Sequence, residues 1–393
     1  MNITMTRNRW IGVGAGIAAI VIAVVLVIVV TGGDKTSEEA VVEETTTTTT
    51  TTLPTWPLTG LPDATAPVAG KHPAVVVKMD NSADARPQTG INEADVVYEL
   101  LVEGITRFAL VFHSNLADPV GPVRSARSSD PNLVADLSKP LFAWSGGNPG
   151  VTAEIRVADE AGILTDASYN LASPAYYRSN DRIAPHNLYV HLPQLLEMMT
   201  PQGQGAPAPI FEYRKVGDPV ATTTTSTIAA SGVTSTTQLA PGTPVPAPGF
   251  TIDFEGAKVD YAWDAAIKGW RRYQVDGTHN RADSATVDPA GKQVAPANVV
   301  IMFLDYGQSP SDSRSPMAIS IGSGPAWVFS DGKVVPGTWN RAKPADPAQL
   351  LDAAGKPILL SPGRTWVELP RKGQRVDFFG QPGADSLLAV KKG

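Results

Sequence analysis

Three short apolar runs, at residues 74–79, 96–102 and 108–112, constrain the fold of this chain most. Each run is rich in Val, Leu and Phe and only five to seven residues long, which is typical of buried strands rather than of helices. The last two are separated by a short turn around Gly104 and predict a hairpin. We therefore expect the folded part of the chain to be organised around residues 75–127.

Charged and amide side chains lie at the ends of these three runs. A purely structural hairpin needs only Lys, Thr or Ser there, so carboxylate and guanidinium groups indicate a binding site. A second segment, Pro185-His186-Asn187, adds a histidine suited to hydrogen bonding in a loop, although a buried structural histidine is an equal alternative. The candidate site residues are Asp80, Asn81, Arg86, Asp95, Glu99, Glu103, Arg107, Arg124, Arg127, His186 and Asn187.

The carboxylates Glu99 and Glu103 are expected on one face of a strand, since an even number of residues separates them. At about 3.3 Å per residue they lie roughly 13 Å apart, too far for the carboxylate pair of a glycosidase. Glu103 and Arg107 flank the Gly104 turn, where an ion pair across the hairpin is expected.

Arg124 and Arg127 precede the sequence Asp130-Pro131, which predicts a helix with Asp130 as its N-cap, running to about Ser138. Two guanidinium groups near free helix N–H groups can bind an anion. The alternative is that the arginines neutralise internal carboxylates, namely Asp80, Glu99 or Glu103. The sequence leaves both interpretations open.

Other catalytic and metal motifs are not found. The chain contains no GxSxG elbow, no P-loop and no HExxH pattern, and its five histidines lack the spacing of a zinc site. It also contains no cysteine, which excludes thiolate metal sites, disulfides and a lipid-modified cysteine. No metal and no cofactor are therefore expected from the residues alone.

The segment from Trp10 to Val30 is almost continuously apolar and, at about 1.5 Å per residue, is long enough to cross a bilayer. Arg7 and Arg9 precede it, and acidic residues follow, which places the N-terminus in the cytoplasm and the bulk outside. A cleaved signal peptide is the alternative, but no small-x-small cleavage site follows Val30. We predict a single-pass membrane protein.

Two low-complexity segments interrupt the rest of the chain. The first is acidic and then threonine-rich, and the second is rich in Thr, Ser and Pro; neither has enough apolar surface to bury. Between and after them we predict an α/β domain and a β-rich domain whose regularly spaced turns are typical of a sandwich or barrel. The predicted organisation is a cytoplasmic tail (1–9), a transmembrane anchor (10–31), a disordered tether (32–57), an α/β domain (58–207) and a β-rich domain (208–390) with a disordered loop at about 219–249.

The fold class expected is therefore α+β. Without Arg7 and Arg9, 30 basic and 38 acidic residues remain, a net charge of −8. This charge excludes nucleic acid as a general partner, because nucleic-acid binding favours a basic surface. The expected partners are the membrane, through Trp10 to Val30, and a cell-envelope polymer or protein.

Several sequence blocks resemble those of the YerB-like family, extracytoplasmic proteins of Gram-positive bacteria. They are MDNSADARPQTG, ADVVYELLVEGITRF, GPVRSAR and RIAPHNLYV, followed by YAWD, NVVIMF, GSGPAWVFSDGK, GTW and SPGRTWVELP. The resemblance implies two domains and an envelope location but no activity. Members are often lipoproteins, whereas this chain has a hydrophobic anchor and no cysteine. The family pattern has two glycines before Ile105 and this chain has one, so its hairpin is expected to be a residue shorter.

A second similarity suggests an enzyme. Envelope phosphotransferases of the LytR-CpsA-Psr type also have one N-terminal anchor, and the similarity implies a site of Asp, Arg and Mg²⁺ acting on a polyprenyl-pyrophosphate-linked glycopolymer. The order Asp95, Arg107, Arg124 and Arg127 is similar in outline. We favour a binding module for an anionic envelope ligand or a protein partner, because no complete catalytic constellation can be identified.

Overall fold

The computed structural model describes residues 53–64, 72–218, 244–276 and 284–390. They belong to one compact unit that begins at Thr52. The expected anchor from Trp10 to Val30 and most of the tether lie outside the described residues. Within the ranges that are described, no helix is both long and apolar enough to cross a membrane.

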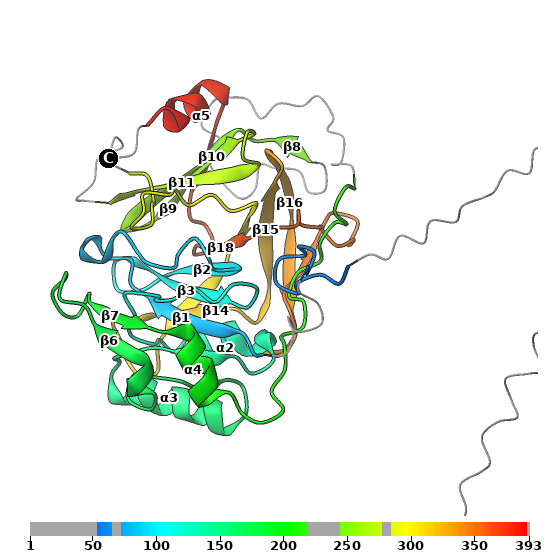
Figure 1. The fold of residues 1–393 in the computed structure, drawn as a ribbon. Coiled ribbons are helices and arrows are strands. Elements are labelled where there is room, and N and C mark those ends of the chain that lie inside the picture. The colour runs from blue at the N-terminus through cyan, green and yellow to red at the C-terminus, as the bar shows by residue number, and fades with distance from the viewer. Residues whose placement is uncertain (1–52, 65–71, 219–243, 277–283, 391–393) are drawn as a thin grey trace, which may run out of the picture. The chain divides into compact units, whose positions relative to one another are not determined.

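An eleven-stranded mixed sheet forms the centre of the unit (Figure 1). Its order is β17-β16-β15-β12-β18-β2-β3-β1-β4-β5, with β8 paired to β16. Strand β18 pairs in parallel with both β12 and β2, so segments on either side of residue 207 contribute to one sheet. The strands are β1 (Val75–Met79), β2 (Val96–Leu101), β3 (Thr106–Phe112), β4 (Leu141–Ala143), β5 (Thr165–Asp166), β8 (Val245–Pro246), β12 (Asn298–Met302), β15 (Gly322–Ser330), β16 (Lys333–Arg341), β17 (Gln349–Leu351) and β18 (Thr365–Leu369).

The three apolar runs are confirmed as strands β1, β2 and β3, and β3 pairs antiparallel with both of the others. Because side chains alternate along a strand, the two faces of this sheet bury different residues. Glu99 and Phe108 belong to one face, whereas Lys78 and Arg107 belong to the other. Each face has its own apolar core.

A second sheet, in the order β11-β10-β9-β19, packs on the Phe108 face. Phe250 of β9 stacks on Phe329 of β15 with 3.7 Å between ring centroids, which joins the two sheets. The expected mostly-β character of the C-terminal half is thus confirmed. The strands are β9 (Gly249–Phe254), β10 (Ala257–Asp264), β11 (Gly269–Asp276) and β19 (Val376–Phe379), followed by helix α5 (Gln381–Leu388), which the sequence did not predict.

Helices cover the N-terminal half of the central sheet. Helix α3 (Pro149–Glu160) buries Val151 and Ile155 in the core of the Arg107 face, and α4 (Leu192–Met199) buries residues in the opposite core. The sequence pattern predicts helical character at Val151–Glu160 and a helix at about Leu192–Met199, and both are confirmed. The remaining elements are α2 (Asp130–Val134), the pair β6 (Tyr176–Arg178) and β7 (Leu188–Val190), the pair β13 (Asp305–Gln308) and β14 (Pro316–Ile319), and the 3-10 turns η1 (Ala83–Ala85), η2 (Ala135–Leu137) and η3 (Ser173–Ala175).

Four local expectations are corrected. Ser129 is the N-cap of α2, while Asp130 is its first residue, and the helix ends at Val134 before continuing as η2. Residues 210–213 have a strand-like sequence, but in the structure they form only a bridge between Tyr213 and Leu360. Two ends of the predicted disordered segments are ordered: β8 pairs with β16, and Thr55 pairs with Pro62.

Candidate functional site

The candidate site lies where the parallel strands β1 and β4 end. Loops at the carboxyl ends of parallel strands are the usual place for ligands in α/β sheets. Asp80 follows β1 directly, and Ser145 lies two residues beyond the end of β4. The extended segment around Arg124 lies between them, because its N–H donates to Lys78 O (2.8 Å) and its carbonyl accepts from Ser145 N (3.0 Å).

Asp80 is fully buried and connects two candidate residues. Its Oδ2 lies 2.9 Å from Arg124 Nε and 2.7 Å from His186 Nδ1. Its Oδ1 accepts a hydrogen bond from Ser82 N (3.0 Å). Burial opposes ionisation of Asp80, but the Ser82 N–H and the charge of Arg124 outweigh it, so the pKa of Asp80 lies below its ordinary value. Asp80 is therefore an anion that holds Arg124 in place.

Ser82, His186 and Asp80 are not arranged as a catalytic triad. The Ser82 hydroxyl (3.1 Å) and the Asp80 carboxylate (2.7 Å) both contact Nδ1 of His186. A triad histidine contacts the nucleophile and the carboxylate through opposite ring nitrogens. His186 instead connects its loop to the end of β1.

Glu103 pairs with Arg127, not with Arg107 as the sequence suggested. Strand β2 ends at Leu101, so Glu103 leaves the strand and does not share a face with Glu99. Arg127 holds it through two parallel contacts, Nε to Oε1 (2.8 Å) and Nη2 to Oε2 (2.7 Å). Burial opposes ionisation of Glu103, but these two hydrogen bonds lower its pKa to about 2.

Arg107 is the cation of the site that lacks a carboxylate partner. It is 3% exposed, and only a long hydrogen bond, from Nη1 to Ser125 O (3.4 Å), engages its guanidinium head. Within the described ranges its Nε has no hydrogen-bond partner and no carboxylate forms an ion pair with it. Burial and the nearby charges of Arg127 and Arg124 lower its pKa to about 10, so it remains charged at neutral pH.

The charges of the site leave one positive charge in excess. Lys78 is fully buried and paired with Asp130 (2.8 Å), and Arg124 and Arg127 are paired with Asp80 and Glu103. Leaving His186 aside, the site contains four cations and three carboxylates, so Arg107 carries the positive charge that has no paired carboxylate. We call Arg107, Arg124 and Arg127 the arginine cluster.

Glu99 and Asn81 lie on the other face of the sheet and belong to a buried polar network. Glu99 accepts from Arg272 Nη2 (2.7 Å) and from the Thr106 hydroxyl (2.6 Å). Asn81 donates to Thr106 (2.7 Å) and to Gln274 (3.0 Å). Arg272 lies against the ring of Trp366 at 4.7 Å. These contacts assign Glu99 and Asn81 to the interior.

Three other candidate residues lie apart from the arginine cluster. Asp95 precedes β2 at the opposite end of the strands, where its carboxylate accepts from His113 N and Ser114 N (both 2.7 Å). Burial raises the pKa of Asp95 despite these bonds. Asn187 donates to Ser179 O within its own loop (3.0 Å), and Arg86 donates to Asn81 O (2.6 Å). The order of residues that resembled a phosphotransferase therefore does not form one cluster, because Asp95 is absent from it.

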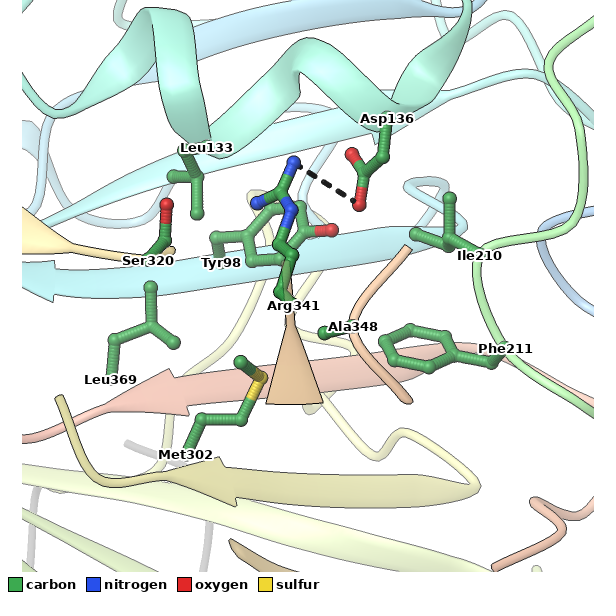
Figure 2. Close-up of a pocket in the computed structure, with 10 residues that line it drawn as sticks. All are labelled: Tyr98, Leu133, Asp136, Ile210, Phe211, Met302, Ser320, Arg341, Ala348 and Leu369. Carbon is green, nitrogen blue, oxygen red and sulfur yellow. Dashed lines mark ion pairs between the residues drawn. The ribbon is translucent and has the colours of Figure 1, made fainter. Parts of the chain in front are cut away.

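A separate small cavity lies beneath helix α2 (Figure 2). Its volume is about 20 Å³, and Asp136 and Arg341 face each other inside it at 3.6 Å. Burial raises the pKa of Asp136 to about 6. Asp136 Oδ1 and the Ser320 hydroxyl have no hydrogen-bond partner among the described atoms. A cavity of this size has room for about one water molecule.

Metal chemistry finds no support in side-chain placement. Over the described ranges, no group of three or more His, Asp or Glu side chains is positioned to hold a metal ion.

Comparisons with known proteins match both halves of the chain. Residues 58–204 match the family described as "Protein of unknown function (DUF3048) N-terminal domain", and residues 250–367 match its C-terminal domain. The chain belongs to this family. It is similar to "Putative lipoprotein YerB" of Bacillus subtilis, with 25% identity over 324 residues that cover 80% of this chain and 85% of the relative.

The fold is shared with a solved structure. The crystal structure of YerB from Bacillus subtilis matches with a TM-score of 0.62 and 23% identity, covering 82% of this chain and 99% of YerB. The arginine cluster lies in the N-terminal DUF3048 domain, while Arg272 brings the C-terminal domain into contact with Glu99.

Sequence reasoning missed three charged residues of these clusters. Lys78 and Glu368 each stand alone within an apolar strand sequence, VVVKM and TWVEL. Arg272 lies in GWRRYQVD of β11. For Lys78 and Glu368, a single charge between apolar neighbours was the available signal, since such a residue must be paired when the strand is buried; Arg272 follows Arg271 and lacks this signal.

Proposed function

We propose that this DUF3048 protein binds an anionic ligand of the cell envelope at the arginine cluster. The single observation that carries the proposal is Arg107, a buried guanidinium without a carboxylate partner in the described structure, behind two arginines that are 23% and 15% exposed in their side chains. The charges of Asp80 and Glu103 offset the burial and the repulsion from the two arginines only in part, and a buried charge without a direct partner is costly. A bound phosphate or carboxylate would neutralise it.

The rigidity of the cluster supports recognition rather than loose surface attraction. Glu103 holds the guanidinium group of Arg127 through two hydrogen bonds, and Asp80 contacts Arg124 through one ion pair. Arginine forks held in this way are well suited to planar oxyanions. The ligand lies outside the cytoplasm in this proposal, because the segment from Trp10 to Val30 acts as the anchor and the similar YerB is named a putative lipoprotein.

The test replaces Arg107 by methionine, which keeps the apolar stem and removes the charge. Inorganic phosphate, pyrophosphate and a uronate are titrated into the full chain in detergent by calorimetry. We expect Arg107→Met to weaken anion binding by about 10- to 150-fold, the equivalent of one charge-assisted hydrogen bond.

Stability and a control variant separate function from structure. Because Arg107 repels its neighbours, the free energy of unfolding without ligand should be unchanged or higher in Arg107→Met. Arg375→Ala removes an arginine whose side chain is 57% exposed and paired with Asp377, and should bind anions normally. Absence of anion binding by the unaltered protein, or a loss of stability in Arg107→Met, would contradict the proposed site.

A further inference from the structure

Residues 53–64 dock on the folded unit, and we call this segment the N-terminal strap. Leu58 of the strap is fully buried in one of the two apolar cores. The Tyr213 hydroxyl donates to Leu58 O (2.6 Å), and Gly363 N donates to Thr59 O (2.7 Å). One buried apolar side chain and two hydrogen bonds to its backbone therefore hold the strap in place.

His113 lies against the strap, one residue after the end of β3. It is 1% exposed, and neither of its ring nitrogens has a hydrogen-bond partner among the described atoms. Trp56 of the strap packs edge-on against the imidazole with 5.2 Å between ring centroids, and the ring of His72 lies 4.9 Å away. A charged imidazole in this position would be a buried cation without a hydrogen-bond acceptor, which is more costly to bury than the neutral ring.

The charges around His113 do not compensate for its burial. Burial lowers the pKa of His113, and the charge of His72 lowers it further; the His72 backbone and the charge of Asp63 oppose this only in part, so the pKa is about 4. Asp95 accepts a hydrogen bond from the His113 backbone N–H (2.7 Å) and not from the ring. His113 is therefore neutral at neutral pH while the strap is docked.

Acid consequently weakens docking of the strap. Undocking removes Trp56 and Asp63 from the imidazole, which then ionises near its ordinary pKa of 6.5. Because the docked state has the lower pKa, docking is strongest above pH 6.5 and weakens as the pH falls toward 4. With these two pKa values, the equilibrium constant for docking should fall roughly 60-fold between pH 7 and pH 4.5.

We propose that the N-terminal strap is an acid-sensitive switch, docked while His113 is neutral and released when His113 is protonated. Along the sequence, the strap lies between the predicted anchor and the rest of the folded unit. Its release frees the segment from residue 53 to residue 64, which spans at most about 40 Å at roughly 3.3 Å per residue. The folded unit then reaches further from its anchor at acidic pH. This inference is independent of the arginine cluster.

Hydrogen–deuterium exchange of the full chain in detergent tests the switch. Exchange at pH 7 and at pH 4.5 is compared after correction for the intrinsic rates. Two backbone amides report on docking: Gly60 N, which donates to Trp56 O (2.8 Å), and Gly363 N, which donates to Thr59 O. We expect the protection of both amides to fall roughly 60-fold at pH 4.5, whereas the amides of β1 keep their protection.

Variants assign the response to His113. His113→Phe keeps an aromatic ring against Trp56 and removes the charge, so the protection of the strap should be equal at the two pH values. His113→Leu makes the same test with a smaller side chain, in case phenylalanine does not fit. His191→Gln is the control: it replaces a histidine whose side chain is 37% exposed and should keep the pH response of the unaltered protein. Leu58→Ala removes buried apolar surface and should move release of the strap to higher pH.

Three results would overturn the proposal. The first is equal protection of the strap at pH 7 and pH 4.5 in the unaltered protein. The second is loss of protection in β1 together with the strap, which would show unfolding of the whole unit instead of release of one segment. The third is a pH response that persists in His113→Phe and His113→Leu, which would assign it to another group.

Discussion

At the scale of single residues, the most unusual feature is a pair of buried carboxylates that share a cation. Glu99 of β2 and Glu368 of β18 are neighbours in register, and both are fully buried. Arg272 pairs with Glu99, while the Tyr261 hydroxyl donates to Glu368 (2.5 Å). Burial, and next the charge of Glu99, raise the pKa of Glu368 well above its ordinary value. Burial and the neighbouring carboxylate therefore favour the protonated form of Glu368 in the folded protein.

Replacing Glu368 by glutamine tests this assignment. The unfolded chain ionises Glu368 at its ordinary pKa, whereas the folded protein keeps it protonated, so the wild type loses stability as pH rises from about 4.5 toward the folded pKa. Glutamine does not ionise and avoids this loss. Urea unfolding should show Glu368→Gln close to wild type at pH 4.5 and more stable by about 1–2 kcal/mol at pH 8. A difference that does not change with pH would contradict a protonated Glu368.

Two adjacent arginines of β11 provide a matched comparison of buried and exposed ion pairs. Arg272→Met leaves the buried Glu99 carboxylate without its cation and should cost about 3–5 kcal/mol of unfolding free energy. Arg271 points to the other side of β11 and pairs with Asp264 at 2.7 Å, with side chains 26% and 18% exposed. Arg271→Met should cost about 1 kcal/mol or less. Equal losses in chemical unfolding would show that Arg272 has no special role.

At the scale of elements, the sequence predicted what local periodicity determines. Strands β1 to β3 and helices α3 and α4 follow from apolar runs and from helix-favouring residues near Pro149 and Leu192. Such patterns do not show which strands pair with each other in the sheet. Strand β18, for example, pairs with β2 although more than 260 residues separate them along the chain. The faces of β2 and β3 then separate Glu99 from Arg107, which the sequence had grouped together. Because β2 ends at Leu101, Glu103 lies beyond the strand, where it pairs with Arg127.

The element at the end of the second low-complexity segment gives a test at this scale. Composition predicts that the whole segment 221–248 contributes little to stability, whereas in the structure β8 pairs with β16 and Ala247 N donates to Gly332 O (2.9 Å). Replacing 221–243 by a short Gly/Ser linker should leave the melting temperature nearly unchanged. Extending the replacement to residue 247 removes β8. This should lower the melting temperature by several degrees, which corresponds to about 1–2 kcal/mol of unfolding free energy. The prediction fails if both replacements melt alike.

At the scale of the whole folded unit, the two DUF3048 domains share structure that neither completes alone. The central sheet passes from C-terminal to N-terminal strands where β18 pairs with β2, and the two cores on its faces draw residues from both domains. The Arg272–Glu99 pair crosses the same boundary without exposure to water. Neither the predicted boundary near residue 207 nor the family boundaries reveal that β18 pairs with β2. Local composition does not determine which strand forms hydrogen bonds with a given strand edge.

The final prediction is that these two domains fold as one cooperative unit. A fragment of residues 53–218 would expose the β2 edge along with Glu99, and a fragment of residues 244–390 would leave β18 without β2 and Arg272 without its carboxylate. Each fragment alone should give poorly dispersed NMR spectra and no cooperative melt, whereas mixing the refolding fragments should restore the melting transition. The unbroken unit should unfold in a single transition, seen equally by far-UV circular dichroism and by tryptophan fluorescence. Independent folding of either fragment, or two separated transitions in the intact chain, would show that the shared sheet does not couple the domains.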